Sequence, residues 1–172
     1  TLLINSLANS LYMRIAYYDI VGDFKSFKTY VNLMTMGDDN IFGSGKPEFN
    51  HTSIAEAMRL RGLTYTMADK ERESVPFINI QEADFLKRTF RKNEVRYVAP
   101  IVPDSIYKSL CMIVEKQSIS EEQVIAQSYL AARMEACLHG RTFFTDFTQK
   151  MDDIYQSSQY NSLFHSKAPS EL

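Results

Sequence analysis

Two neighbouring acidic residues between short apolar runs are the feature that most constrains the fold of this chain. The runs occupy residues 30–36 and 41–42. The tetrapeptide between them consists of residues that tight turns prefer, namely Gly37, Asp38, Asp39 and Asn40. This arrangement predicts a tight β-hairpin with both carboxylates at its tip.

A long helix is expected before this hairpin, over residues 2–19. Its large apolar side chains recur every four residues, at Leu3, Leu7, Leu11 and Ile15. A neighbouring face has polar side chains at the same spacing, at Thr1, Asn5 and Asn9. These amides and hydroxyls either satisfy one another inside the protein or face a ligand that carries hydroxyl groups. Gly22 and Asp23 would end the helix.

The remaining elements are shorter. They are a helix over 52–61, a strand over 63–66, a second hairpin with strands 84–91 and 95–99, and helices over 105–116, 120–139 and 142–156. Ser53 with Glu56, and Ser120 with Gln123, have the spacing of capping boxes. The last helix has an apolar side made of Phe143, Phe144, Phe147, Met151 and Ile154.

These elements predict an α+β fold up to about residue 100 and a helical part after it, with residues 157–172 as a Ser-rich tail. With 172 residues, 45% of them apolar, the chain can bury a core without a metal or disulfide. Cys111 and Cys137 form neither a disulfide framework nor a zinc pattern, which fits a reducing compartment. The chain begins inside a helical pattern and not with Met, so we expect an internal fragment of a longer polypeptide.

The paired acids could carry chemistry. Asp38 and Asp39 repel each other, and a hard divalent cation such as Mg²⁺ would compensate their charge. Two such ions can activate an attacking hydroxyl and stabilise a leaving pyrophosphate. Gly, Asp and Asn are equally typical of an ordinary hairpin turn, so the tetrapeptide alone leaves both interpretations open.

A basic run and one further lysine are the other candidates. Five cations lie among aromatic residues within ten positions, at Lys87, Arg88, Arg91, Lys92 and Arg96. Such a segment suits a phosphate backbone with stacked bases, or it is the solvated face of a hairpin. Lys70 could act as a general acid or be an ordinary surface lysine. The net charge of −2 leaves any nucleic-acid surface to a local patch of this kind.

Four stretches in this order resemble motifs B, C, D and E in the palm of RNA-dependent RNA polymerases from picorna-like positive-strand RNA viruses. They are Thr1-x-x-x-Asn5-Ser6, Met36-Gly37-Asp38-Asp39, Thr66-x-Ala68-Asp69-Lys70 and Phe85-Leu86-Lys87-Arg88-Thr89-Phe90. Residues from Pro103 to Leu110 are similar to the start of that family's thumb. The resemblance implies a partial palm over residues 1–100, thumb helices over 101–156 and a flexible tail over 157–172.

The resemblance also implies roles. Asp38 would bind catalytic Mg²⁺ or Mn²⁺ with support from Asp39, and Lys70 would protonate the departing pyrophosphate. Thr1 and Asn5 would recognise the ribose 2′-hydroxyl. Three basic residues would contact RNA, namely Lys87, Arg88 and Arg91. Met36 departs from the tyrosine that is usual before Gly-Asp-Asp, which removes a hydroxyl from that position.

The implied partners are template and product RNA, nucleoside triphosphates, the upstream fingers and palm segment, and other viral replication proteins. The implied location is the host cytoplasm, in membrane-associated replication complexes, with no transmembrane segment in this chain. The motif that carries the other metal-binding aspartate is expected upstream of Thr1, so we expect the chain alone to be catalytically inactive.

Three alternatives remain open on the sequence. A reverse transcriptase also has paired aspartates on a hairpin, but with a different residue in the place of Gly37. A non-catalytic RNA-binding or scaffold domain would use only the basic hairpin. An α+β domain with no nucleic-acid role would use neither feature.

Overall fold

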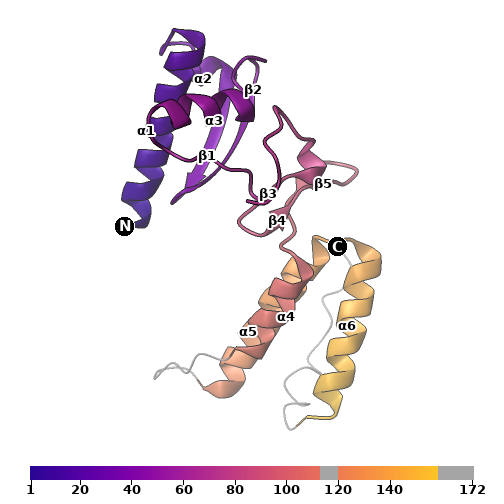
Figure 1. The fold of residues 1–172 in the computed structure, drawn as a ribbon. Coiled ribbons are helices and arrows are strands. Elements are labelled where there is room, and N and C mark those ends of the chain that lie inside the picture. The colour runs from indigo at the N-terminus through magenta and orange to yellow at the C-terminus, as the bar shows by residue number, and fades with distance from the viewer. Residues whose placement is uncertain (113–119, 159–172) are drawn as a thin grey trace. The chain divides into compact units, whose positions relative to one another are not determined.

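The computed structural model describes residues 1–112 and 120–158, and Figure 1 shows their helices and strands. The chain divides into two compact units, Thr1–Leu86 and Lys87–Leu172. The mixture of helices and small antiparallel sheets confirms the α+β class. In these described ranges, no helix combines the length and the apolar character that crossing a membrane would need.

The first unit begins with the expected helix, α1 (Leu2–Val21). Gly22 ends it in a left-handed conformation, with φ 82°, and its N–H donates to the Tyr18 carbonyl at 2.9 Å. A short helix that the sequence analysis did not predict follows, α2 (Phe27–Tyr30). The carboxylate of Asp23 accepts hydrogen bonds from the backbone N–H groups of Lys25 and Ser26, which come just before α2. Asp23 therefore shapes the turn between α1 and α2.

The predicted hairpin is confirmed as β1 (Val31–Met36) and β2 (Asp39–Ser44). The two strands pair antiparallel from Met36 opposite Asp39 to Val31 opposite Ser44. Gly37 and Asp38 are the two turn residues, and Gly37 has φ 63°. Asp38 does not have a positive φ. Positive φ at the first turn residue alone is the pattern of a type II′ hairpin turn, and glycine is the residue that favours this position.

The next helix, α3 (His51–Leu60), starts earlier than predicted. Its capping box joins Asn50 and Ser53, and not Ser53 and Glu56: the Asn50 side chain accepts the Ser53 N–H, and the Ser53 hydroxyl accepts the Asn50 N–H, each at 3.1 Å. Glu56 forms an ion pair with Arg59 instead, at 2.8 Å. Asparagine is as good an N-cap as serine, so the spacing of Ser53 and Glu56 alone predicted the wrong N-cap residue for α3.

Residues 63–66 do not form the predicted strand, because the chain there has neither helical nor strand structure. Side chains hold this segment, since Leu63 and Tyr65 pack against the core of the unit. The core lies where α1 contacts the hairpin and α3. At its centre Tyr17 meets Phe27 and Phe49 edge to face, with ring centroids 5.1 and 5.0 Å apart.

The predicted continuous strand over 84–91 is wrong. The first unit ends with η1 (Ile80–Glu82) and β3 (Asp84–Phe85), and the second begins with β4 (Arg88–Thr89). Between β3 and β4, Leu86 and Lys87 have φ 55° and 60°, which interrupts an extended strand.

The second hairpin is confirmed in a shorter form, as β5 (Arg91–Lys92) and β6 (Tyr97–Val98). The Asn93 side chain shapes its turn by accepting the N–H groups of Val95 and Arg96 at 3.1 and 2.7 Å.

Three helices complete the second unit: α4 (Pro103–Cys111), α5 (Glu121–Cys137) and α6 (Arg141–Gln156). The Ser120 hydroxyl caps α5 by accepting the Gln123 N–H at 3.3 Å, as the spacing predicted. Buried side chains from all three helices form the core, namely Ile106, Tyr129, Ala132, Ala136, Phe147 and Met151. Ile154 was predicted on the apolar side of α6 but is 58% exposed. The predicted end of α4 at residue 116 and most of the predicted tail lie outside the described residues.

Candidate active site

The backbone of the acidic turn is held by two side chains of α1. The Gly37 N–H donates to the Ser6 hydroxyl at 2.8 Å. The Asn9 Nδ2 atom lies 2.7 Å from the Asp38 carbonyl oxygen and 3.2 Å from those of Gly37 and Asp39. The Gly37 Cα faces the helix so closely that an added Cβ would lie 3.3 Å from the Leu2 side chain. The turn therefore rests on α1 by its backbone.

Both carboxylates of the turn are accessible. Asp38 and Asp39 are exposed, whereas Gly37 beside them is buried. Asp38 lines a cavity of about 340 Å³ in the first unit, and Asn5 lines the same cavity. The structure thus brings together two residues that are more than 30 positions apart in the chain and that the sequence predicted to share a site. Thr1 is exposed one helical turn before Asn5.

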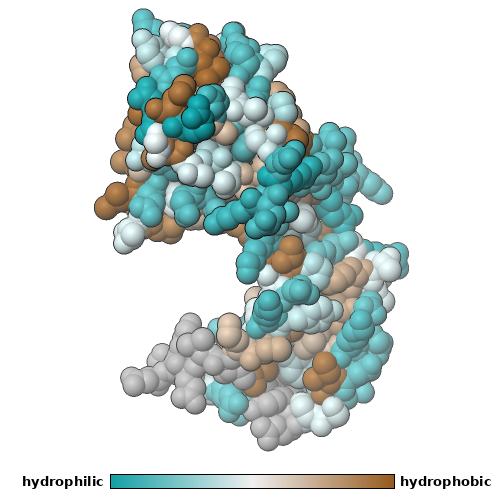
Figure 2. Space-filling view, viewed as in Figure 1, coloured by the Kyte–Doolittle hydropathy of each residue, from teal (hydrophilic) through white to brown (hydrophobic). Residues whose placement is uncertain are grey.

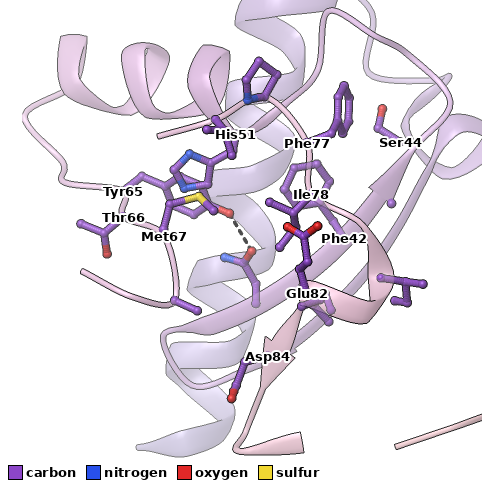
Figure 3. A pocket seen from close by; sticks show the side chains of 18 of the residues that line it. Phe42, Ser44, His51, Tyr65, Thr66, Met67, Phe77, Ile78, Glu82 and Asp84 are labelled. Atoms are coloured by element: carbon purple, nitrogen blue, oxygen red, sulfur yellow. Dashed lines mark hydrogen bonds between the residues drawn. The ribbon is translucent and has the colours of Figure 1, made fainter. Parts of the chain in front are cut away.

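A series of side-chain hydrogen bonds connects the acidic turn with residues 63–66, the segment that follows α3. The Asn40 Nδ2 atom donates to Asn9 Oδ1 at 3.0 Å, and the Tyr65 hydroxyl donates to Asn40 Oδ1 at 2.8 Å, the bond dashed in Figure 3. Burial raises the pKa of Tyr65 to about 12, so this phenol is protonated and remains a donor at neutral pH. The cavity that Asp38 and Asn5 share is also lined by Asn9, Asn40 and Tyr65.

The donor set fits a hard cation in part. Asp38 and Asp39 offer carboxylate oxygens, and within residues 1–112 and 120–158 no group of three or more His, Cys, Asp or Glu side chains surrounds a common point. Mg²⁺ is commonly held by one or two carboxylates, with water and substrate phosphates as its other ligands. Two carboxylates that leave the remaining positions to water and substrate phosphates are compatible with a hard divalent cation.

Lys70 does not line the cavity that Asp38 and Asn5 share. It is exposed in the irregular segment after residue 67. Its neighbour Asp69 lines a larger cavity of about 800 Å³ beside β2. Figure 3 shows this cavity between the hairpin and the loop that carries Phe77 and Ile78.

The sequence analysis missed the larger cavity because its lining loop follows no helical or strand periodicity. No role was predicted for Ser6. Asn9 was predicted only to lie on a polar face that is either buried or directed at a ligand. The four-residue spacing of Thr1, Asn5 and Asn9 was the available signal, since it places these side chains along one face of α1.

The three predicted RNA-binding cations lie in the second unit, and two of them bind protein groups there. Lys87 is exposed. Arg88 makes a two-point contact with Glu135 on α5, at 2.7 and 3.0 Å, and also donates to the Ala99 carbonyl at 2.7 Å. The Arg88 guanidinium lowers the pKa of Glu135. Arg91 donates to the Leu138 carbonyl at 3.2 Å, just beyond the end of α5.

Apolar side chains are exposed along the first half of α1. Leu3, Ile4 and Leu7 are 81%, 70% and 62% exposed, and brown atoms beside the N-terminus mark part of this surface in Figure 2. The helix thus presents an apolar surface there and rests on the acidic turn through Ser6 and Asn9.

Comparison with known proteins identifies the family of the chain. The family model described as viral RNA-dependent RNA polymerase matches residues 1–156. The chain is 29% identical over 164 residues to the RNA1 polyprotein of Cherry rasp leaf virus, covering 88% of this chain and 7% of that polyprotein. It is 31% identical over 169 residues to the genome polyprotein of Rice tungro spherical virus (strain Vt6), covering 88% and 5%.

A third relative comes from an insect virus. The chain is 31% identical over 153 residues to the replicase polyprotein of Drosophila C virus, covering 82% of this chain and 9% of that polyprotein. The chain spans less than a tenth of the length of each of these polyproteins. The resemblance to picorna-like polymerases is confirmed by these matches, and the chain belongs to the viral RNA-dependent RNA polymerase family.

Proposed function

We propose that this chain is the part of a viral polymerase that holds the catalytic metals and begins the thumb, and that the complete protein joins nucleoside triphosphates into RNA on an RNA template. The observation that carries the proposal is the exposed Asp38-Asp39 turn, which shares a cavity with Asn5. An ordinary hairpin turn does not need a cavity that is lined both by an aspartate of the turn and by an asparagine of a neighbouring helix.

Polymerases of this family generally use divalent metal ions. We propose Mg²⁺ or Mn²⁺ as the ion here, held by Asp38 with support from Asp39 and by a further carboxylate upstream of Thr1. A bound pair of such ions would lower the barrier by stabilising the attacking and leaving oxygens of the phosphoryl transfer. Ser6 and Asn9 hold the backbone beneath the two exposed carboxylates, so a cation would meet them on a turn that is already fixed.

Nucleotide selection is proposed for Asn5 and Thr1. Asn5 lines the cavity that Asp38 also lines, and an amide can both donate to and accept from a ribose hydroxyl. A deoxyribonucleotide would leave that amide unpaired, which costs binding energy. Lys70 is proposed as the general acid for the leaving pyrophosphate, a role that requires it to approach the cavity when substrate is bound.

RNA contact is proposed for Lys87, Arg88 and Arg91, with residues 1–100 as palm and 101–156 as thumb. Lys87 is exposed and suited to a phosphate. The bonds of Arg88 to Glu135 and of Arg91 to Leu138 tie their segment to α5. We therefore propose that Arg88 and Arg91 also support the segment that presents Lys87.

The partners follow from this proposal: template and product RNA, nucleoside triphosphates, the upstream fingers and palm segment, and other viral replication proteins. The relatives are polyproteins, which supports an upstream segment that completes the site. The proposed location is a membrane-associated replication complex in the host cytoplasm.

The test is primer extension by the complete polymerase that contains this chain. Asp38→Asn keeps the size of the side chain and removes its charge, and we expect a rate at least about 10³-fold lower, the equivalent of about 4 kcal/mol of transition-state stabilisation. RNA affinity should stay within about twofold. Asp146→Asn is the matched control, because it removes an exposed carboxylate that makes only a surface ion pair with Lys150.

Full synthesis by the Asp38→Asn variant would refute the metal assignment and favour a non-catalytic RNA-binding domain. Preferential incorporation of deoxyribonucleotides by the wild-type protein would instead favour the reverse transcriptase alternative.

A further inference from the structure

Asn9 is the only buried polar or charged residue in the ranges 1–112 and 120–158, apart from residues counted with the apolar core. Its amide has one acceptor and two donors, and all of them are used. The acceptor binds the Asn40 amide, and the donors face the three carbonyl oxygens of Gly37, Asp38 and Asp39. Because the partners of this buried amide lie in one turn and beside it, the position of the turn and the position of the amide depend on each other.

The orientation of this amide is determined by its surroundings. With its oxygen and nitrogen exchanged, Asn9 would direct Oδ1 at three carbonyl oxygens and Nδ2 at the Asn40 amine group. Asn40 is fixed in turn, because Asn9 Oδ1 can only accept and so faces the Asn40 Nδ2 atom, which leaves the Asn40 oxygen to accept from the Tyr65 hydroxyl at 2.8 Å. The chain from Tyr65 through Asn40 to Asn9 therefore allows one arrangement only.

The same residues that accept from Asn9 carry the carboxylates. The backbone carbonyls of Asp38 and Asp39 face Asn9 on α1, while both residues are exposed and their carboxylates are accessible. A shift of the turn on α1 would move both carboxylates together. We infer that Asn9 is a positioning residue, whose amide sets the place of the Asp38 and Asp39 carboxylates through the turn backbone, with Asn40 and Tyr65 holding that amide in orientation. The inference rests on the proposed function.

A purely structural role would give a different result from a positioning role. A residue that only stabilises the fold changes the fraction of active molecules, whereas a positioning residue changes what each active molecule does. The measurement is therefore single-nucleotide incorporation by preassembled complexes of the complete polymerase with primer and template RNA. The rate constant and the active fraction are read separately, and the Mg²⁺ concentration is titrated.

The main variant is Asn9→Asp, which has the same shape but directs an oxygen at the three carbonyls. We expect the maximal rate constant to fall about 10²-fold, the cost of a displacement of about 1 Å in a catalytic group. The Mg²⁺ concentration for half-maximal rate should rise severalfold, because both carboxylates are displaced. Asn32→Asp is the matched control, since it makes the same change at an exposed position of the same hairpin.

Tyr65→Phe is the second variant, because it removes one hydroxyl from the far end of the hydrogen-bonded chain and keeps the ring in the core. We expect a smaller change in the same direction, about threefold to tenfold in the maximal rate constant. If Asn9→Asp forms no RNA complex, Tyr65→Phe decides alone.

A wild-type rate constant and Mg²⁺ dependence in the surviving complexes of both variants would overturn the inference, even with a reduced active fraction. Such a result alongside an inactive Asp38→Asn variant would leave the proposed function standing. An active Asp38→Asn variant would remove the proposed function itself.

Discussion

Arg88 and Glu135 offer a quantitative test of how the segment after β3 is held. Arg88 donates to both carboxylate oxygens of Glu135 and to the Ala99 carbonyl, at distances of 2.7 to 3.0 Å. The side chains are 37% and 30% exposed. Exposed ion pairs contribute about 0.2–1 kcal/mol, and removing one partner of a buried pair costs about 3–5 kcal/mol. Two-point geometry at this partial exposure places the coupling between the two residues at about 1–2 kcal/mol.

The assay is hydrogen exchange on the complete polymerase, at the amides of the same segment. The Thr89 N–H donates to the Pro100 carbonyl and the Val102 N–H to the Lys87 carbonyl, so both report local opening. A coupling of about 1.4 kcal/mol corresponds to about tenfold faster exchange when either partner is replaced by alanine. The Arg88→Ala/Glu135→Ala double variant should exchange no faster than the worse single variant.

The pH dependence of this pair has a definite sign. The pKa of Glu135 is lowered in the folded protein, chiefly by the hydrogen bond from Arg88, so the contribution of the pair is present above the ordinary value of 4.5 and is lost as pH falls below it. Protection of Thr89 and Val102 should therefore be constant from about pH 7 to 5 and fall at lower pH, and the fall should be absent in Glu135→Gln. Additive effects of the two alanine substitutions, with a coupling below about 0.3 kcal/mol, would refute the assigned interaction.

Three further predictions concern the first unit and the chain as a whole. Gly37→Ala should destabilise the protein by about 1–2 kcal/mol in thermal unfolding, because Gly37 has φ 63° and the new Cβ would meet Leu2 at 3.3 Å; Gly43→Ala, with open space around it, is the control that should change little. Asn5→Ala in the complete polymerase should reduce the preference for ribo- over deoxyribonucleotides by at least about tenfold in competition assays, and an unchanged preference would exclude Asn5 from ribose recognition. The 172-residue chain alone should show no template-dependent nucleotide incorporation, and measurable incorporation would show that no upstream carboxylate is needed.

The acidic hairpin and the helices α1, α3, α4, α5 and α6 could be predicted because each has a local cause. The period of Leu3, Leu7 and Leu11 predicted α1, and Gly37 with its neighbours predicted the turn between β1 and β2. Yet those three leucines are exposed, at 81%, 62% and 51%. The four-residue period correctly predicted a helix. However, the polar face that contains Asn9 packs on the hairpin, whereas hydrophobicity alone would have predicted that the leucine face does so.

The errors arose where tertiary contacts outweigh local pattern. Leu63 and Tyr65 are typical strand residues, but their side chains pack into the core while their backbone lacks a strand partner. The break at Leu86 and Lys87 was hidden because neither residue type favours positive φ. The partner of Arg88 lies 47 residues away, so the sequence showed only a cation in a basic run.

The most direct test of the central claim is to locate the metal on the chain itself. In the complete polymerase, Fe²⁺ in place of Mg²⁺ with peroxide and ascorbate generates hydroxyl radicals that cleave the backbone near a bound ion. The account predicts cleavage within a few residues of Asp38, protected by excess Mg²⁺ and abolished by Asp38→Asn with the fold retained. No cleavage near Asp38, or cleavage at the turn that persists in Asp38→Asn, would contradict the claim that these carboxylates hold the metal.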